Sequence, residues 1–322
     1  MIVAALLAPV FLDSYIQHVL ILILYTAYLS TSWNILGGYA GQLSIGHAAF
    51  LGVGAYSSTV LLAKMGLTPW LGMWIGVALA VALAWVVGSI TFRFRLRGHY
   101  FTLATIAVAE ILRLAALHID YIGAAAGLMV PTTENSILYF VSTEKHLYYY
   151  TILVMLCALL VTVWALERSK TGVYWLAIRE DEQASEASGI DTSRYKLRAM
   201  IISSAFLAIG GTFYAQYVTY IDPDTVLGVL PSVEMLLPAI VGGLGTLFGP
   251  LLGAVILVPL SEGTKAWFTS SRGIHMLVYG IVLMLFLRFM SQGVLGMLER
   301  LKTPARSESE EARVSATAEE RK

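Results

Sequence analysis

The sequence predicts an all-α polytopic membrane protein, and its hydrophobicity and charge distribution carry this prediction. Of its 322 residues, 57% are hydrophobic and only 13% are charged, whereas soluble domains carry about 25% charged residues. Residues 299–322 hold 12 of the 42 charged side chains, and the first 63 residues hold only Asp13. This composition excludes a soluble enzyme, a disordered protein and a disulfide scaffold. The net charge of zero gives no reason to expect nucleic acid as a partner.

The apolar stretches predict about 8–10 transmembrane helices within residues 1–298, because a hydrocarbon core of about 30 Å needs about 20 apolar helical residues. The stretch 2–12 is short for a span, and 233–262 is interrupted by several glycines and Pro250. The latter is therefore predicted to form two short helices or a re-entrant pair. The charged tail at 299–322 is expected to be cytoplasmic and disordered. Full-length spans are predicted at 15–36, 44–63, 68–91, 100–117, 147–166, 199–219 and 274–290.

Lys and Arg accumulate in cytoplasmic loops, and their distribution orients these spans. The loop at 93–97 holds three Arg, and the long loop at 167–198 holds six Lys and Arg. The loops at 118–146 and 220–232 together hold one Lys and no Arg, so they are predicted to lie outside. This alternation requires 233–273 to enter and leave on the outer side, which favours two short helices. The residues before 64 carry too little charge to predict their orientation in the membrane.

The long loop at 167–198 is predicted to carry a helix from Thr171 to Gly189 on the cytoplasmic surface. Thr171 suits an N-cap, and Gly189 suits the left-handed position after a helix. The loop's six acids balance its six bases, which suits a protein partner better than anionic lipid. A solvated surface helix and a helix that docks a soluble partner are both open. Candidate docking residues are Arg179, Glu180, Asp181, Glu182, Glu186 and Gly189.

Two glycine-rich breaks interrupt the apolar runs, one in each half of the chain, at 37–47 and 242–250. Unwound backbone at membrane depth must be buried in protein or line a wet cavity, and paired breaks point to a transport pathway. The alternative is close helix packing through small residues, which we favour for the second break. We favour a pathway for the first, because Gln42, Ser44 and His47 lie beside it. The break glycines are Gly37, Gly38, Gly41, Gly242, Gly243, Gly245 and Gly249.

Two opposite charges, Glu110 and Arg113, lie one helical turn apart in the span at 100–117. Glu110 is expected about 15 Å beyond Tyr100, near the middle of the hydrocarbon core. A bare charge there is costly, so a partner is expected. The pair is interpreted either as an ion pair that fastens helices together or as a polar wall of a translocation pathway.

An intramembrane enzyme is the rival from another class, but its motifs are missing from the sequence. No His is followed by Glu, so the H-E-x-x-H zinc motif is absent, and no Gly-Lys pair marks a phosphate loop. Ser44 and His47 are close in sequence, but no third orienting group is evident. We therefore expect no catalytic residue, metal or cofactor on this chain.

Four motifs occur in order along the chain: W-N-x-x-G-G-Y-A-G-Q-L-S-I-G-H-A-A-F at 33–50, R-G-x-Y-F-x-L-A-T from 97, A-I-R-E-D-E from 177 and I-V-G-G-x-G-T from 240. Together they resemble the signature of permease subunits of high-affinity branched-chain amino acid ABC importers, over roughly residues 15–295. The resemblance implies that the segment from Arg179 to Gly189 couples to an ATPase, and that the fold is that of an ABC importer permease.

The resemblance also implies partners. Such a permease pairs with a second, homologous permease and with two cytoplasmic ATPase subunits, which bind the ATP and Mg. A periplasmic or surface-tethered solute-binding protein delivers the solute. The chain is then a multi-pass protein in the lipid bilayer of the bacterial cytoplasmic (inner) membrane. Branched-chain or other aliphatic amino acids are the expected solutes, and urea, amides or other amino acids are the alternatives.

Overall fold

The computed structural model describes residues 13–131, 140, 145–267, 280–281, 284 and 294–295. Six helices in this part of the chain are long and apolar enough to cross a membrane. The predicted all-α membrane fold is therefore confirmed. The stretch 2–12, most of the predicted span at 274–290 and the tail at 299–322 lie outside the described residues. The six helices are α2 (Ser14–Asn34), α3 (Ala48–Met65), α4 (Pro69–Arg93), α5 (His99–His118), α6 (Lys145–Glu167) and α9 (Thr192–Val218).

Two of these helices begin away from their predicted positions. Helix α3 begins at Ala48 rather than at residue 44, because residues 40–47 belong to the first break. Helix α9 begins at Thr192, seven residues before the predicted 199. Asp191 explains this early start, since its side chain accepts a hydrogen bond from the backbone N–H of Arg194 at 3.0 Å and so caps the helix. The charges of the loop therefore extend into the first two turns of α9.

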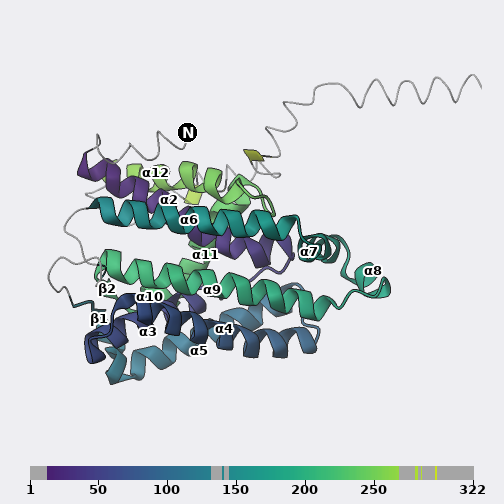
Figure 1. Ribbon diagram of the computed structural model, residues 1–322, viewed down its shortest axis with the longest axis horizontal. Coiled ribbons are helices and arrows are strands. Elements are labelled where there is room, and N and C mark those ends of the chain that lie inside the picture. The colour runs from purple at the N-terminus through teal and green to yellow at the C-terminus, as the bar shows by residue number, and fades with distance from the viewer. Residues whose placement is uncertain are drawn as a thin grey trace, which may run out of the picture.

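The six helices run roughly along one axis of the molecule (Figure 1). Helices α7 (Lys170–Glu180) and α8 (Glu182–Ala187) project at one end, which we call the α7 end. A two-residue antiparallel ribbon lies at the opposite end, which we call the ribbon end. It pairs β1 (Leu128–Met129) with β2 (Tyr220–Ile221) and is followed by α10 (Pro223–Leu227). Two 3-10 turns, η2 (Asp120–Ile122) and η3 (Ala124–Ala126), precede the ribbon.

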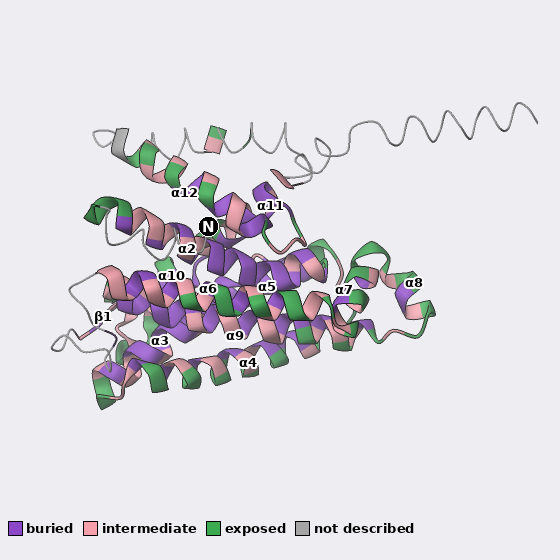
Figure 2. Ribbon diagram, turned by 45° about the horizontal axis from the view of Figure 1, so that its top comes forward, coloured by how far each residue is buried: buried purple, intermediate pink, exposed green. Residues whose placement is uncertain are grey.

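Helix α2 lies in the middle of the bundle and is packed on most sides. Every residue from Ala27 to Leu36 is buried, and α6, α9, α11 and α12 all contact this helix. In contrast, α4, α5 and α6 keep large apolar side chains exposed, among them Trp74, Leu103 and Val154, and Figure 2 shows the exposed stripe along α4. Apolar surfaces of this kind are stable against lipid or another membrane chain rather than water.

The segment predicted as two short helices forms α11 (Val229–Gly242) and α12 (Gly249–Trp267). Helix α11 follows α10 at the ribbon end, and the break after it contacts α7 through Arg179. Helix α12 returns along α2, so the pair enters and leaves at the same end. The predicted division into two helices is confirmed, but only α11, with 14 residues, is short, since α12 has 19 residues. A Cβ on Gly242 would lie 1.7 Å from the carbonyl oxygen of Gly249, so these two helices pack backbone to backbone.

Candidate functional site: the glycine breaks and the α7–α8 loop

The first break begins as a π-helix and ends as unwound chain. Helix α2 continues into the π-helix η1 (Ile35–Tyr39), which contains Gly37 and Gly38. Residues 40–47 then have no helical structure until α3 begins, and Gly41 adopts a φ of +68°. The N–H of Gln42 donates to the carbonyl of Leu36 at 3.0 Å, so the unwound chain folds back on the end of α2. Such π-helical turns are rare and are common at functional sites.

The three polar side chains of the first break are buried and bonded within the chain. His47 is fully buried, with Nδ1 2.6 Å from the Ser44 hydroxyl and Nε2 3.1 Å from the Ser203 hydroxyl. Gln42 donates to the carbonyl of Ala40 at 3.3 Å. His47 and the two serines satisfy one another, and Gln42 bonds the backbone. The second partner of His47 is the Ser203 hydroxyl, whereas a Ser–His nucleophile would have a third group there that orients the imidazole as a base. Their assignment to the solute pathway stays a prediction.

The two breaks lie against each other, although about two hundred residues separate them in the sequence. The side chain of Asn34 makes this contact: its Oδ1 accepts from the N–H of Gly245 at 3.0 Å, and its Nδ2 donates to the carbonyl of Thr246 at 3.1 Å. Asn34 is completely buried. Our reading of the sequence noted Asn34 only as part of a motif. The missed signal was a lone amide within a long buried run, immediately before a break.

Arg179 of α7 reaches the same place from the loop. Its Nη1 donates to the carbonyl of Gly38 at 3.0 Å. A Cβ on Gly245 would lie 2.0 Å from this Nη1, and Gly245 also has a φ of +69°, so only glycine fits there. Beside this contact, the Tyr39 hydroxyl donates to Oε1 of Glu167 at 2.6 Å. The predicted docking residue Arg179 therefore holds both breaks from the α7 end.

The remaining break glycines also stand at close contacts between backbones or rings. A Cβ at Gly37 would meet the ring of Trp33, and one at Gly249 would meet the carbonyl of Gly243, which itself has a φ of +135°. Packing therefore accounts for Gly242 and Gly249, as expected for the second break.

The predicted single helix from Thr171 to Gly189 is wrong: the loop forms two helices, α7 and α8. Asp181 separates them, because it is extended and its Oδ1 accepts from the N–H groups of Gln183 and Ala184, at 2.8 and 3.0 Å. An Asp that bonds its neighbours' backbone in this way starts a new helix. The N-cap of α7 is Ser169 rather than Thr171. Gly189 has a φ of +86°, as predicted.

Buried charges fasten α8 to the body of the protein. Nζ of Lys196 lies 2.6 Å from Oε2 of Glu182, and the Lys196 side chain is only 3% exposed. Arg97, from the turn after α4, pairs with both Glu182 and Glu186 at 3.3 Å. Glu186 also accepts from the Thr192 hydroxyl at 2.9 Å. Two of the predicted docking acids thus hold the loop in place, whereas Glu180 and Asp181 are exposed.

An apolar surface remains exposed on this fixed loop. Val173 and Leu176, one turn apart on α7, are 61% and 56% exposed. Ala184 and Ala187 on α8 are exposed as well. We call these four residues the α7–α8 surface. Since the loop is held rigidly and lies outside the membrane-crossing helices, this surface has the form of a docking site.

Glu110 and Arg113 form the expected ion pair, and a third charge joins them. The guanidinium of Arg113 donates to both carboxylate oxygens of Glu110, at 2.9 and 2.5 Å, and to Oδ1 of Asp224 at 2.5 Å. Asp224 lies on α10 at the ribbon end. Arg113 therefore fastens α5 to α10, which supports the fastening interpretation. The Glu110 side chain is also 38% exposed, so the pathway interpretation stays open.

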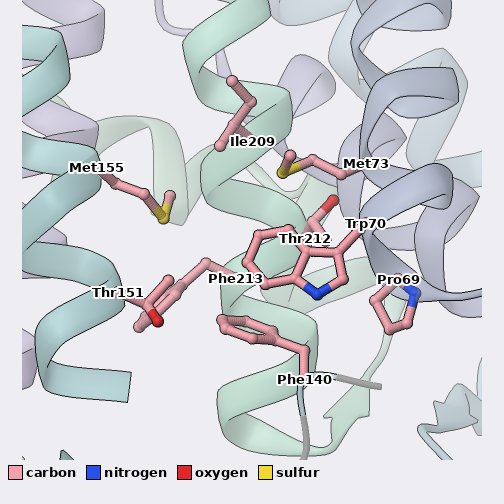
Figure 3. Close-up of a pocket in the computed structure, with 9 residues that line it drawn as sticks. All are labelled: Pro69, Trp70, Met73, Phe140, Thr151, Met155, Ile209, Thr212 and Phe213. Carbon is pink, nitrogen blue, oxygen red and sulfur yellow. The ribbon is translucent and has the colours of Figure 1, made fainter. Parts of the chain in front are cut away.

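Two hollows lie among the described residues without any of the predicted pathway residues in their lining. One is a cavity of about 10 Å³ between α4, α6 and α9, lined by apolar side chains such as Trp70 and Met155 (Figure 3). It is too small for a solute. The other, of about 580 Å³, opens between α2, α9, α11 and α12, and Glu234 and Lys265 line it.

Six membrane-crossing helices, two broken segments that meet and a charged loop at one end are typical of an integral membrane permease. The chain belongs to the family described as branched-chain amino acid transport system / permease component, which matches residues 15–287. This confirms the resemblance inferred from the motifs.

Individual relatives agree with the family. The high-affinity branched-chain amino acid transport system permease protein LivM of Escherichia coli is 27% identical over 292 residues, which cover 84% of this chain and 67% of LivM. LivH of Escherichia coli, with the same description, is 22% identical over 291 residues, or 85% of this chain and 92% of LivH. The fructose import permease protein FrcC of Rhizobium meliloti is 22% identical over 135 residues, or 40% of this chain and 37% of FrcC. No solved structure matches the chain significantly.

Proposed function

We propose that this chain is one of two permease subunits of an ATP-driven importer that carries branched-chain amino acids across a bacterial cytoplasmic membrane. The observation that carries the proposal is the α7–α8 surface, which is exposed and apolar on a loop that the ion pairs of Lys196 and Arg97 with Glu182 and Glu186 fasten to the bundle. In the importer, two ATPase subunits bind on the cytoplasmic side, and one of them docks on this surface. ATP and Mg bind to those subunits, and this chain does no covalent chemistry.

The charges of the described residues support the orientation. Only Lys64, Lys145 and Lys265 stand near the ribbon end, together with Arg113. Since basic residues concentrate on the cytoplasmic side, the α7 end faces the cytoplasm and the ribbon end faces the solute-binding protein. The basic residues of the α7 end are Arg93, Arg95, Arg97, Arg168, Lys170, Arg179, Arg194, Lys196 and Arg198.

The second permease binds along the exposed face of α5. This face carries Leu103 and Ile111, which are 61% and 64% exposed, and beside them the partly exposed Glu110. A charge in a membrane-crossing helix is placed against protein or water rather than lipid. Glu110 and Arg113 then lie where the two permeases enclose the pathway.

Docking is tested by purifying the chain together with ATPase subunits of its own organism. The double substitution Val173→Asp and Leu176→Asp is expected to abolish co-purification, because it places two charges in an apolar interface. Met129→Asp is the matched control, since Met129 is 77% exposed but lies at the ribbon end. ATPase recovery at the wild-type level with the double variant would refute docking at this surface.

The solute is tested by uptake into proteoliposomes that contain the complete assembly. Labelled leucine is expected to accumulate only with ATP, and unlabelled isoleucine and valine should compete, whereas urea, acetamide and fructose should not. The FrcC relative makes fructose a necessary competitor. Competition by urea or amides, but not by aliphatic amino acids, would replace the solute while keeping the transport function. Hydrolysis of ATP by the purified chain alone would contradict the whole proposal.

A further inference from the structure

We infer that Asn34 and Arg179 are positioning residues that hold the two glycine breaks together and make both breaks follow α7. The inference rests on the proposed function in one respect: α7 is the element that the ATPase subunits move. It goes beyond docking, because it assigns to two side chains inside the permease the transfer of that movement to the membrane-embedded backbone.

Asn34 supplies the link between the breaks. Its amide uses both its donor and its acceptor on neighbouring backbone groups of the second break, at Thr246 and Gly245. Two bonds in one plane fix orientation as well as distance. Because Asn34 is completely buried, losing either bond leaves a polar group without water to replace its partner.

Arg179 supplies the link to α7. The π-helix leaves the carbonyl of Gly38 available, and the guanidinium of Arg179 donates to it while lying against Gly245. The side chain thus touches both breaks, and its backbone belongs to the helix that carries the α7–α8 surface. Trp175 pins the same helix to α9, since its Nε1 donates to the carbonyl of Tyr195 at 2.8 Å.

The hydrogen bond from Arg179 to Gly38 is 3.0 Å long, and such a bond is lost when the distance exceeds about 3.5 Å. A shift of α7 by about 1 Å therefore carries the breaks along, or this bond is lost. The glycines at 38 and 245 allow the backbones to meet without side chains between them. Release of the Arg179 bond would free both breaks from α7, while the Asn34 bonds would still join the breaks to each other.

The test uses the complete assembly in lipid nanodiscs with Arg179→Ala, Arg179→Lys and Asn34→Asp. Asn34→Asp keeps the acceptor for Gly245 but puts an oxygen against the carbonyl of Thr246. Arg194→Ala is the matched control: it removes a cation at the same end that pairs with Asp191, one turn away, at 3.8 Å. Measured are the recovery of ATPase subunits, ATP hydrolysis with and without solute-loaded binding protein, and solute transported per ATP.

Arg179→Ala should assemble normally but lower the solute stimulation of ATP hydrolysis by about tenfold, the effect of losing one strong hydrogen bond. Asn34→Asp places a carboxylate at a completely buried site, so it should lower the yield of the assembly as well as the solute stimulation. Arg179→Lys should recover part of the coupling, and Arg194→Ala should behave as wild type. Wild-type stimulation and transport per ATP in both Arg179→Ala and Asn34→Asp would overturn the inference. If the ATPase subunits do not bind the wild-type chain either, the proposed function has failed and this inference falls with it.

A thiol reporter follows the movement of the breaks in the assembly without changing Asn34 or Arg179. Cys157 is the only cysteine of the chain, so Cys157→Ser leaves a background in which Leu244→Cys is the single thiol. Leu244 lies in the second break and is 38% exposed. With the wild-type Asn34 and Arg179, its labelling by a membrane-impermeant maleimide should change about tenfold between the ATP-bound and the nucleotide-free assembly. An equal rate in the two states would show that the breaks do not follow α7 and would overturn the inference.

Discussion

Removing Glu182 should loosen α8 because it strands a buried cation. In Glu182→Gln, the ammonium of Lys196 loses its carboxylate at 2.6 Å, while its side chain stays 3% exposed. Loss of one partner of a buried ion pair costs about 3–5 kcal/mol. Glu182 itself is 18% exposed, so water offsets part of this, and we take about 2–4 kcal/mol. At about 1.4 kcal/mol per factor of ten, the open population of α8 should rise about 30- to 700-fold.

Amide hydrogen exchange of the peptide 181–190 measures this opening directly. The double variant Glu182→Gln with Lys196→Met should exchange far more slowly than Glu182→Gln alone, because no charge is left buried. Arg194→Ala serves as the exposed control: the Arg194 and Asp191 side chains are 68% and 56% exposed, and this pair is worth less than about 1 kcal/mol. Wild-type exchange in Glu182→Gln, or an equal effect of the single and double variants, would refute a buried ion pair as the fastening of α8.

Two further predictions concern the membrane-crossing helices. Glu110→Gln removes one of two carboxylates from Arg113 and should lower uptake or the yield of the assembly, and wild-type values of both would leave the ion cluster without a role. Gly242→Ala places a methyl 1.7 Å from the carbonyl of Gly249 and should destabilise the α11–α12 pair by about 1–3 kcal/mol, seen as a lower Tm of the detergent-solubilised chain. In Gly263→Ala, in α12, the added methyl would have no atom within 4 Å. This variant should therefore leave the Tm unchanged or raise it. Equal losses of Tm in Gly242→Ala and Gly263→Ala would contradict backbone packing between α11 and α12.

The long apolar runs were predictable from the sequence because burial in lipid makes nearly every residue of a span apolar. The predicted end of α4 at residue 91 is within two residues of the observed end at Arg93. The start of α9 was missed because the apolar run used for the prediction begins only after the charged residues of the loop. The helix itself begins earlier, where the side chain of Asp191 caps it. Hydropathy marks the membrane boundary, and capping marks the helix boundary.

The site was only partly predictable for a related reason. Composition located both glycine breaks and the charged loop, but nothing local indicates that Asn34 bonds to Gly245, or that Arg179 turns inward to Gly38. Those contacts arise from packing between segments far apart in sequence. The split of the loop at Asp181 was predictable from the local sequence, since Asp followed by Glu, Gln and Ala is typical of a helix start. We read it as part of one charged helical face.

The π-helix at the end of α2 has a consequence for how this protein can move. A π turn holds one residue more than an α turn, so η1 gives the otherwise tightly packed end of α2 one extra residue. Shifting that extra residue along the rod rotates each side chain that it passes by about 100° and advances it by about 1.5 Å, while the rest of α2 stays in place. The end of α2 can therefore change the orientation of its side chains when the π turn shifts, and the helix does not have to slide past its neighbours.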